Sequence, residues 1–430
     1  MNLMTSTVNL MTTTPMTTTD DWGGALEAVA ASLGLTLIAS RQFHSEATGE
    51  GFTTGHEVDV EAADGSRETQ IVYAESHPRG RERPGVLRLR DDDSGQRIDV
   101  WLYPRDPRLP ALAAAVFPAA AGVLLERLGL DATGLALEIV AYRPGKRAVV
   151  RMTTATGILY LKVVKPEAVD LIRSRHELWQ RHGLPVPGVR ASASDGIVVL
   201  DTLPGVEAIG ILPGIAAGDA FLDALDRLVA RINSVPSETA ARASLVARLD
   251  WYRRRLEVVA PDSRADLERT RELIAEHYAR GGPPPSITVH GDLHLGQVFV
   301  DPVNPTEIVG VLDIDTAGLG DPADDAAALV AHLLVTAEHR DGVGEPGLAE
   351  TARSLADRSR RRWARVDDPG FAARATAITA THLLGHALSG SVSVPTAVRL
   401  SAAVFADFAT SEDESALTTA SHSSHTDAEA

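Results

Sequence analysis

The feature that most constrains this chain is a pair of short apolar segments, each of which leads into a loop that carries an aspartate. The first lies in ITVHGDLHLGQVFVD, residues 287–301, where the apolar run ends at His290 and Asp292 and Gln297 follow on one loop. The second lies in VLDIDTAGLGDP, residues 311–322, where Asp313 ends the run. Runs of this length bounded by polar turns are typical of buried strands. Two such strands, joined by a turn as an embedded hairpin, would bring both carboxylates and the amide to one point.

This set of side chains suits phosphoryl transfer, a reaction that depends on positioning and charge neutralisation more than on covalent chemistry. One carboxylate is needed to orient the attacking hydroxyl and accept its proton. A second carboxylate and an amide oxygen can hold magnesium on the phosphates, because this hard cation prefers oxygen ligands. A lysine from elsewhere in the chain must meet the phosphate oxygens.

The region before these loops changes from strands to helices. Residues 137–142, 148–152 and 158–164 are three short apolar segments joined by short loops, which predicts an antiparallel meander. Pro166 then opens a helix in the first-turn position that proline tolerates. From about residue 205 onward, helical patterns dominate. A β-rich segment followed by a helix-rich one predicts an α+β protein with two lobes.

The loop sequence HGDLHLGQV resembles the H-G-D-x-x-x-x-N loop of aminoglycoside phosphotransferases and related small-molecule kinases, and it is similar to the loop of maltokinase. LDIDTAGLGDPADD resembles the I-D-x-x-x-x-x-x-G-D-P-x-x-D segment of that family. YRPGKRAVVR at 142–151 and YLKVV at 160–164 look like its phosphate loop and its ATP-lysine strand. The resemblance covers roughly residues 135–345 and implies a bilobal protein-kinase-like fold that binds ATP and Mg²⁺.

The resemblance also implies roles for individual residues. Asp292 would be the catalytic base or the residue that orients the hydroxyl, and Asp313 would bind magnesium. Lys162 would contact the α- and β-phosphates, with Glu177 on the following helix as its ion-pair partner. His290 would be a structural member of the catalytic loop.

Two departures from the family pattern concern the metal and the phosphates. Gln297 stands where the family has asparagine, so the added methylene requires a shifted loop or an intervening water if the amide is to reach Mg²⁺. The phosphate loop has no G-x-G-x-x-G and contains only Gly145, between basic residues. Lys146 and Arg147 are expected to reach the phosphates from this short hairpin.

Simpler explanations exist for several of these residues. Glu177 has Arg173 and Arg181 four residues away on either side, so a helical ion-pair ladder also explains it. Asp321 precedes Pro322 and a long apolar helix, where an N-cap is its simplest role.

Two further acidic residues, Asp324 and Asp325, fall in the first turn of the same helix, where negative charge is favoured. His294 is expected to pack within its loop. Two roles remain open for Asp315: assisting the metal or holding the loop.

The chain divides by composition into five segments. Residues 1–20 are Thr-rich and 411–430 are rich in Ser, Thr and acidic residues, so both are expected to be disordered. Residues 21–130 read as an accessory α+β domain with a linking helix, 131–204 as the N-lobe and 205–410 as the C-lobe.

Charge and composition exclude several partners. The formal net charge is −17, which disfavours nucleic acid and anionic membranes. No run of 18 apolar residues predicts a membrane span, the N-terminus lacks the pattern of a signal peptide, and a cytoplasmic enzyme is expected. The partner of the accessory domain is not identified by its sequence.

The function predicted from the sequence is ATP-dependent transfer of the γ-phosphate to a hydroxyl of a small polyhydroxylated molecule, such as a sugar, amino sugar or aminoglycoside. Two alternatives use the same loop. One is a kinase for Ser or Thr in peptides. The other is a nucleotide-binding pseudokinase that acts as an interaction module, in which Gln297 weakens metal binding.

Overall fold

The computed structural model describes residues 22–78, 83–90 and 95–409, so the two predicted disordered ends lie outside the described residues. The chain forms two units, residues 1–203 and 204–430. Both contain helices and antiparallel strands, which confirms the predicted α+β class.

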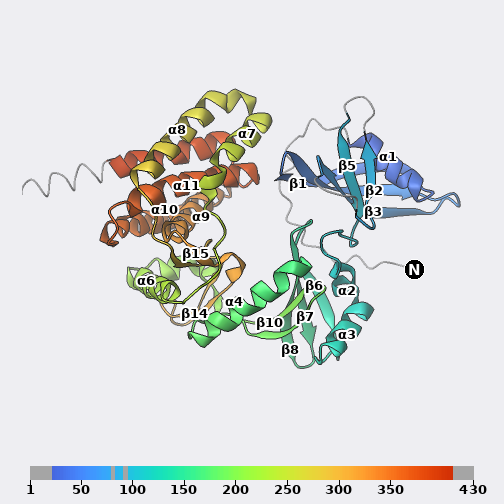
Figure 1. Ribbon diagram of the computed structural model, residues 1–430, viewed down its shortest axis with the longest axis horizontal. Coiled ribbons are helices and arrows are strands. Elements are labelled where there is room, and N and C mark those ends of the chain that lie inside the picture. Colours follow the sequence, from blue (N-terminus) through green and yellow to red (C-terminus); the bar gives the residue numbers. More distant parts are fainter. Residues whose placement is uncertain (1–21, 79–82, 91–94, 410–430) are drawn as a thin grey trace, which may run out of the picture. The chain divides into compact units, whose positions relative to one another are not determined.

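The first sheet of unit 1, in which Figure 1 labels β1, β2, β3 and β5, is antiparallel. Its strand order is β1-β2-β3-β5-β4. Its members are β1 (Thr36–Thr48), β2 (Gly51–Glu61), β3 (Arg67–Ser76), β4 (Leu87–Arg90) and β5 (Arg97–Leu102). Helix α1 (Gly23–Ser32) packs against it, with Leu26 meeting Val58, Val72 and Val100 in a buried cluster. In β1 residues 36–41 are mostly exposed, whereas residues 43–45 are buried.

The second sheet of unit 1 contains the predicted meander. Its order is β6-β7-β8-β10-β9, formed by β6 (Ala136–Arg143), β7 (Arg147–Thr154), β8 (Gly157–Val164), β9 (Val189–Ala193) and β10 (Ile197–Asp201). The short helices α2 (Leu112–Val116) and α3 (Pro118–Arg127) precede it. Pro166 begins a 3-10 turn, η1 (Pro166–Ala168), and α4 (Val169–Arg181) follows directly.

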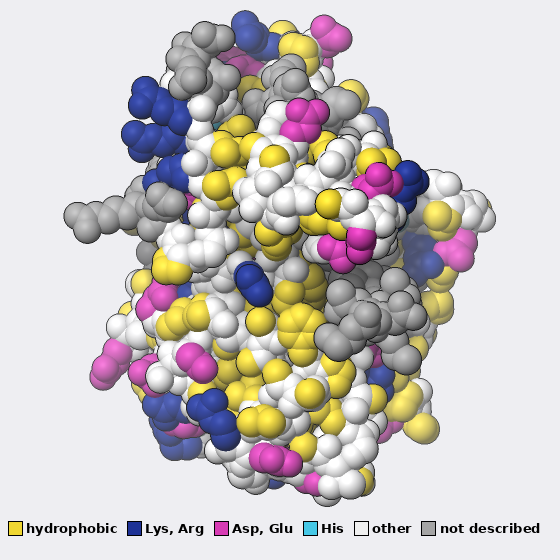
Figure 2. All heavy atoms as spheres, turned by 90° about the vertical axis from the view of Figure 1, so that its right-hand side faces the viewer, with side chains coloured by type: hydrophobic (Ala, Val, Ile, Leu, Met, Phe, Trp, Pro, Cys, Tyr) yellow, Lys and Arg dark blue, Asp and Glu magenta, His cyan; other side chains and the backbone are white. Residues whose placement is uncertain are grey.

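One hydrophobic core joins the two sheets of unit 1. Tyr73 and Trp101 from the first sheet belong to the same buried cluster as Leu112 of α2 and Val150 and Leu161 of the second. Burial of that much aromatic and aliphatic surface is the main force that holds the sheets together. On the face of this unit seen in Figure 2, hydrophobic side chains are interspersed with charged ones.

Unit 2 is mostly helical. Its helices are α5 (Leu212–Ile215), α6 (Ala220–Asn233), α7 (Leu249–Val259), α8 (Arg264–Arg280), α9 (Ala323–Gly342), α10 (Pro346–Arg361) and α11 (Phe371–Leu388). Residues 394–409 are also helical. Helix α11 contacts α7, α8 and α9 and is buried along most of its length, as expected for a helix without a polar face (Figure 1).

Short turns and strands complete unit 2. The 3-10 turns are η2 (Ala208–Ile211), η3 (Leu245–Arg248), η4 (Pro261–Ser263), η5 (Ile314–Thr316) and η6 (Trp363–Arg365). The strands are β11 (Val206–Glu207), β12 (Ile287–Val289), β13 (Val298–Val300), β14 (Ile308–Val311) and β15 (Gly318–Gly320). None of the helices within the described ranges is long and apolar enough to cross a membrane.

The predicted hairpin between the two aspartate-bearing strands is wrong. Strand β12 pairs with β15, whereas β14 pairs with β13, and β13 also pairs with β11. The segment between β12 and β14 contains β13. This strand pairs with β14, whereas the sequence predicted β12 as the partner of β14. In the antiparallel pair of β13 and β14, Val298 lies opposite Val311. Gln297 and Leu312 are therefore neighbours where this pair of strands ends.

Candidate active site

The loop that carries Asp292 is fixed by one buried carboxylate. Asp325, in the first turn of α9, accepts backbone N–H bonds from His290 at 2.8 Å, Gly291 at 2.7 Å and Leu293 at 3.3 Å. Burial raises the pKa of Asp325, while nearby His290 and these three N–H donors act against that rise. The position of Asp325 in the first turn of its helix predicted a favourable interaction with the helix dipole, but its side chain instead sets the shape of the loop.

His290 joins this loop to the segment after β14. Its Nε2 donates to the carbonyl oxygen of Leu312 at 2.8 Å, and the Thr316 hydroxyl donates to the carbonyl oxygen of His290 at 2.9 Å. Gly291 has φ of +84°, and a Cβ there would lie 2.8 Å from the Thr316 carbonyl oxygen. The loop therefore needs glycine both for its backbone conformation and for the close approach of its neighbour.

Asp292 is held by Arg242, a residue that the sequence analysis missed. The guanidinium lies 3.3 Å from each carboxylate oxygen and also donates to the carbonyl oxygen of Gly291 at 2.9 Å. Burial would raise the pKa of Asp292, but Arg242, with help from His382 and His294, outweighs it and lowers the pKa. The side chain is 24% exposed, so an ionised acceptor remains open to a small molecule.

Gln297 lies at the end of the β13–β14 pair beside Leu312, the residue that precedes Asp313, and the Leu312 N–H donates to the Gln297 backbone carbonyl oxygen at 2.8 Å. The Gln297 side chain is buried, and its Oε1 has no hydrogen-bond partner among the described residues. Such an orphaned oxygen is costly and calls for a water, a ligand or a cation as its partner. Asp313 has φ of +57° in the left-handed region, a strained state for a non-glycine residue. Carboxylate and amide oxygens together fit Mg²⁺.

In unit 1, Lys162 and Glu177 lie on β8 and α4. Lys162 is buried in the middle of the sheet, opposite Val149 on one side and Val198 on the other. It is therefore not on an edge strand. Glu177 forms an ion pair with Arg173 at 3.0 Å, so the ladder suggested by the spacing is present on the Arg173 side, and among the described residues Glu177 has no ion pair with Arg181.

The basic hairpin between β6 and β7 is tied to the first sheet by Glu46, which the sequence analysis did not consider. Lys146 Nζ lies 2.7 Å and Arg143 2.5 Å from the Glu46 carboxylate. Burial raises the pKa of Glu46, but the two cations dominate and lower it to about 2. Arg147 begins β7, and a phosphate that approaches Lys146 must compete with the Glu46 carboxylate.

Four histidines gather near Asp292. The rings of His294 and His332 are stacked with centroids 3.8 Å apart, and His386 lies edge-on to His332 at 4.6 Å. His382 is 6.4 Å from His332. Burial lowers the pKa of His382 to about 3 and of His386 to about 4, and it lowers those of the other two as well. In the sequence, only one part of this cluster can be seen: His382 and His386 are four residues apart, a spacing that places them on the same face of a helix.

A buried ion pair anchors the start of α9. The Arg374 guanidinium, fully buried on α11, lies 2.8 Å from the carboxylate of Asp321 and 2.5 Å from that of Asp368. Asp321 also accepts the N–H of Ala323 at 3.0 Å, which agrees with its expected capping role. Because α9 carries Asp325, this network also supports the geometry of the Asp292 loop.

Asp324 is expected to make the stability of unit 2 depend on pH. Burial, together with Asp321 and Asp325, raises its pKa to about 7, against the opposing effects of the Ser244 hydroxyl bond at 2.6 Å and of Arg242. A raised pKa favours the folded state below the unfolded value of 3.8, and this contribution is lost as the pH rises through about 7. As the pH rises from 3.8 to about 7, the unfolding free energy of Asp324→Asn should therefore increase relative to that of the wild type. The increase should be about 1.4 kcal/mol for each unit by which the pKa of Asp324 is raised.

Denaturation of both proteins between pH 4 and pH 8 measures this gain. Asp250→Asn, at an exposed position of α7, is the control and should show no such trend. A constant difference between Asp324→Asn and the wild type over that range would contradict the assignment.

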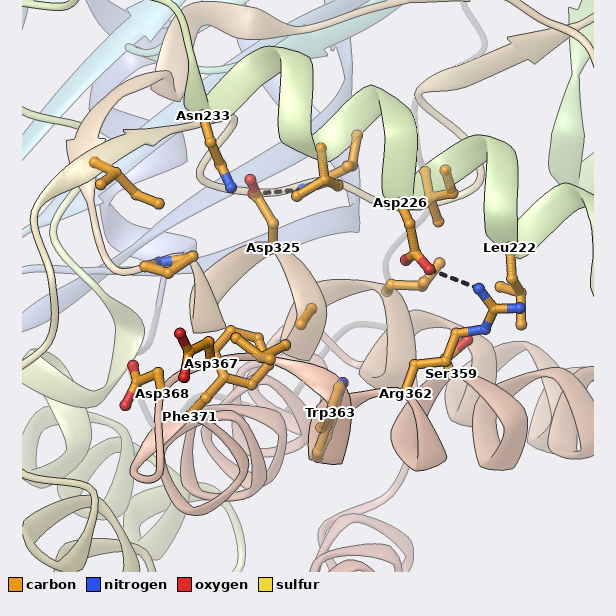
Figure 3. Close-up of a pocket in the computed structure, with 18 of the residues that line it drawn as sticks. Leu222, Asp226, Asn233, Asp325, Ser359, Arg362, Trp363, Asp367, Asp368 and Phe371 are labelled. Carbon is orange, nitrogen blue, oxygen red and sulfur yellow. Dashed lines mark hydrogen bonds and ion pairs between the residues drawn. The ribbon is translucent and has the colours of Figure 1, made fainter.

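A cavity of about 320 Å³ lies in unit 2, and Asp292 is not among the described residues that line it. Figure 3 shows Arg362 and Asp226 joined along its wall, with N–O 2.6 Å, and Asp325 at another point of the wall. Leu293, Trp363 and Phe371 add apolar lining. The carboxylate that fixes the Asp292 loop therefore also borders this cavity.

Comparison with known proteins identifies the class of this chain. The family model described as "Phosphotransferase enzyme family" matches residues 108–367, more than half of the 430 residues. The protein is thus a phosphotransferase that uses an alcohol group as acceptor. The chain belongs to the phosphotransferase enzyme family. No curated protein matches it.

Similar solved structures include three small-molecule phosphotransferases. Aminoglycoside phosphotransferase APH(3'')-Id from Streptomyces rimosus is 22% identical, with 61% of this chain and 97% of that one covered and a TM-score of 0.38. Macrolide 2'-phosphotransferase MphH from Brachybacterium faecium is 20% identical over 66% and 97%, also with a TM-score of 0.38. Glucosamine kinase, in complex with glucosamine, ADP and inorganic phosphate, is 19% identical over 91% and 100%, with a TM-score of 0.40.

Proposed function

We propose that this protein transfers the γ-phosphate of ATP to a hydroxyl of a small polyhydroxylated molecule: a sugar, an amino sugar or an aminoglycoside. The observation that carries the proposal is that Asp292 is an ionised, partly exposed carboxylate. Arg242 holds this carboxylate, and Asp325 holds the loop that carries it. An ionised carboxylate only accepts hydrogen bonds, so it can orient an incoming hydroxyl and take its proton. The phosphotransferase family match supports the same chemistry.

In this proposal Asp313 and the Gln297 amide hold Mg²⁺, which neutralises phosphate charge when bound. The orphaned Gln297 oxygen and the strained Asp313 backbone support these two assignments. Lys162 and the hairpin residues Lys146 and Arg147 contact the ATP phosphates in this proposal. Glu177, which is paired with Arg173 in this structure, exchanges that partner for Lys162.

The role of Arg242 follows from its contacts. It holds Asp292 in one orientation and, through the Gly291 carbonyl, links the carboxylate to its own loop. Fixing a catalytic group before substrate arrives removes part of the entropic cost of reaching the reactive geometry.

We also propose the domain limits given by the composition: an accessory domain at 21–130, an N-lobe at 131–204 and a C-lobe at 205–410. A core of its own around Leu26, Val58 and Val100 supports an accessory module, which a second core, containing Tyr73 and Trp101, joins to the N-lobe sheet.

The direct test is a screen of ATP-dependent phosphorylation against sugars, amino sugars, aminoglycosides and Ser/Thr peptides, with Mg²⁺ present. We expect a phosphorylated small molecule. Phosphorylation of peptides alone would favour the protein-kinase alternative, and ATP binding without any phosphorylated product would favour the pseudokinase.

The assignment of Gln297 predicts the behaviour of two variants. Gln297→Ala removes the amide oxygen, so the Mg²⁺ concentration for half-maximal turnover should rise at least about tenfold, by analogy with the cost of losing outer-shell metal partners. Gln297→Asn keeps an amide and serves as the matched control, with turnover maintained or raised. Unchanged Mg²⁺ dependence in Gln297→Ala would remove Gln297 from the metal site.

A further inference from the structure

The imidazoles beside Asp292 create a second set of metal-ligating atoms. One oxygen of Asp292 and one ring nitrogen each of His332 and His382 all lie within 4.8 Å of one another. A tetrahedral zinc site places its ligand atoms about 3.3 Å apart, given bond lengths near 2.0–2.2 Å. Side-chain movements on the order of 1 Å would therefore bring the ligand atoms of all three residues within bonding distance of one ion.

The elements that carry these ligands are fixed independently of any ion. His332 lies on α9 and His382 on α11, two helices that pack against each other. Asp292 lies on the loop held by Asp325 and Arg242. His294 and His386 flank His332 and limit the movement of its ring.

The donor chemistry differs from that of Gln297 and Asp313. Two imidazoles and one carboxylate suit borderline-soft ions such as Zn²⁺ or Co²⁺, whereas Mg²⁺ prefers oxygen ligands. Three protein ligands leave the fourth tetrahedral position open for water. The two sets of residues should therefore select different metals.

We propose that Asp292, His332 and His382 form a binding site for a zinc-class divalent ion, and that occupation of this site stops phosphoryl transfer. The ion takes the carboxylate oxygen that would otherwise orient the acceptor hydroxyl. This inhibitory part rests on the proposed role of Asp292, whereas metal binding itself does not.

Arg242 sets the strength of this site. Its guanidinium lies 3.3 Å from both oxygens of Asp292, so its positive charge repels an incoming cation. Arg242→Gln should consequently bind Zn²⁺ more tightly than the wild type. This gain of affinity cannot be produced by a variant that merely fails to fold.

Metal binding is tested on the untagged full chain with Co²⁺ and Zn²⁺ alone. We expect one strong site, with the visible absorption of tetrahedral Co²⁺ and displacement by Zn²⁺. His332→Gln and His382→Gln should each weaken binding by more than about 100-fold, since a direct ligand matters more than an outer-shell partner. His339→Gln is the matched control, because His339 lies two turns further along α9 and contacts the Ser391 carbonyl instead.

Equal affinity in the wild type, His332→Gln and His339→Gln would overturn the site, as would octahedral Co²⁺ absorption in the wild type. For inhibition, Zn²⁺ should stop turnover in the wild type and in His339→Gln at the concentration that fills the site. A chelator should restore turnover. Metal bound with the predicted spectrum but with turnover unchanged would overturn the inhibition alone, leaving the site intact.

Discussion

Asp292→Asn is expected to lower kcat for phosphoryl transfer by about 10²–10⁴-fold, the usual range for loss of a general base. Asparagine keeps the size of the side chain and an oxygen that Arg242 can bond, but it cannot take the proton of the acceptor hydroxyl. The KM for ATP should change much less, because the proposed phosphate contacts come from other residues. Steady-state kinetics with a thermal unfolding check measure both effects.

Asp301→Asn is the matched control for this substitution. Asp301 accepts N–H bonds from Val303 and Asn304 in a surface turn after β13, and asparagine can accept the same bonds. It changes the net charge by the same amount and should leave kcat unchanged. If Asp292→Asn retains kcat within about threefold of the wild type, Asp292 is not the base.

Arg374→Met is expected to cost about 3–5 kcal/mol of unfolding free energy, the range for breaking one side of a buried ion pair. Asp321 would remain with its charge buried and its strongest partner gone, because its side chain is only 3% exposed. The double variant Arg374→Met/Asp321→Asn should recover part of the loss, since it removes the stranded charge. Urea denaturation followed by circular dichroism measures these differences.

A surface ion pair provides the control for Arg374. Arg399 lies 2.6 Å from Glu338, but its side chain is 60% exposed, so Arg399→Met should cost about 1 kcal/mol or less. Similar losses in Arg374→Met and Arg399→Met would contradict the structural role of the buried network.

Local patterns in the sequence predicted much of the fold. The meander of β6, β7 and β8 and the helices α3 and α4 follow from apolar periodicity, turns and proline placement, which are short-range signals. The pairing of β12 and β14 was predicted wrongly because strand partners are chosen by tertiary contacts. The backbone N–H and C=O groups of β12 bond to β15, a strand that follows β14 in the sequence.

The residues that complete the site were harder to find for the same reason. Arg242 lies in an irregular segment without a motif, and only the fold carries it to Asp292. The histidines of α9 and α11 are far apart in the chain, and Arg374 meets Asp321 through helix packing alone. The loop that carries Asp292 was visible because its strand, glycine and aspartate are contiguous.

The most direct test of the proposed function is mass spectrometry of the acceptor after incubation with ATP and Mg²⁺, using wild-type protein and Asp292→Asn. We predict that the wild type adds one phosphoryl group to a hydroxyl of a sugar, an amino sugar or an aminoglycoside, and that Asp292→Asn forms this product at a rate lower by at least about 10²-fold. The proposal is contradicted if no small hydroxylated acceptor is phosphorylated, or if both proteins form the product equally fast.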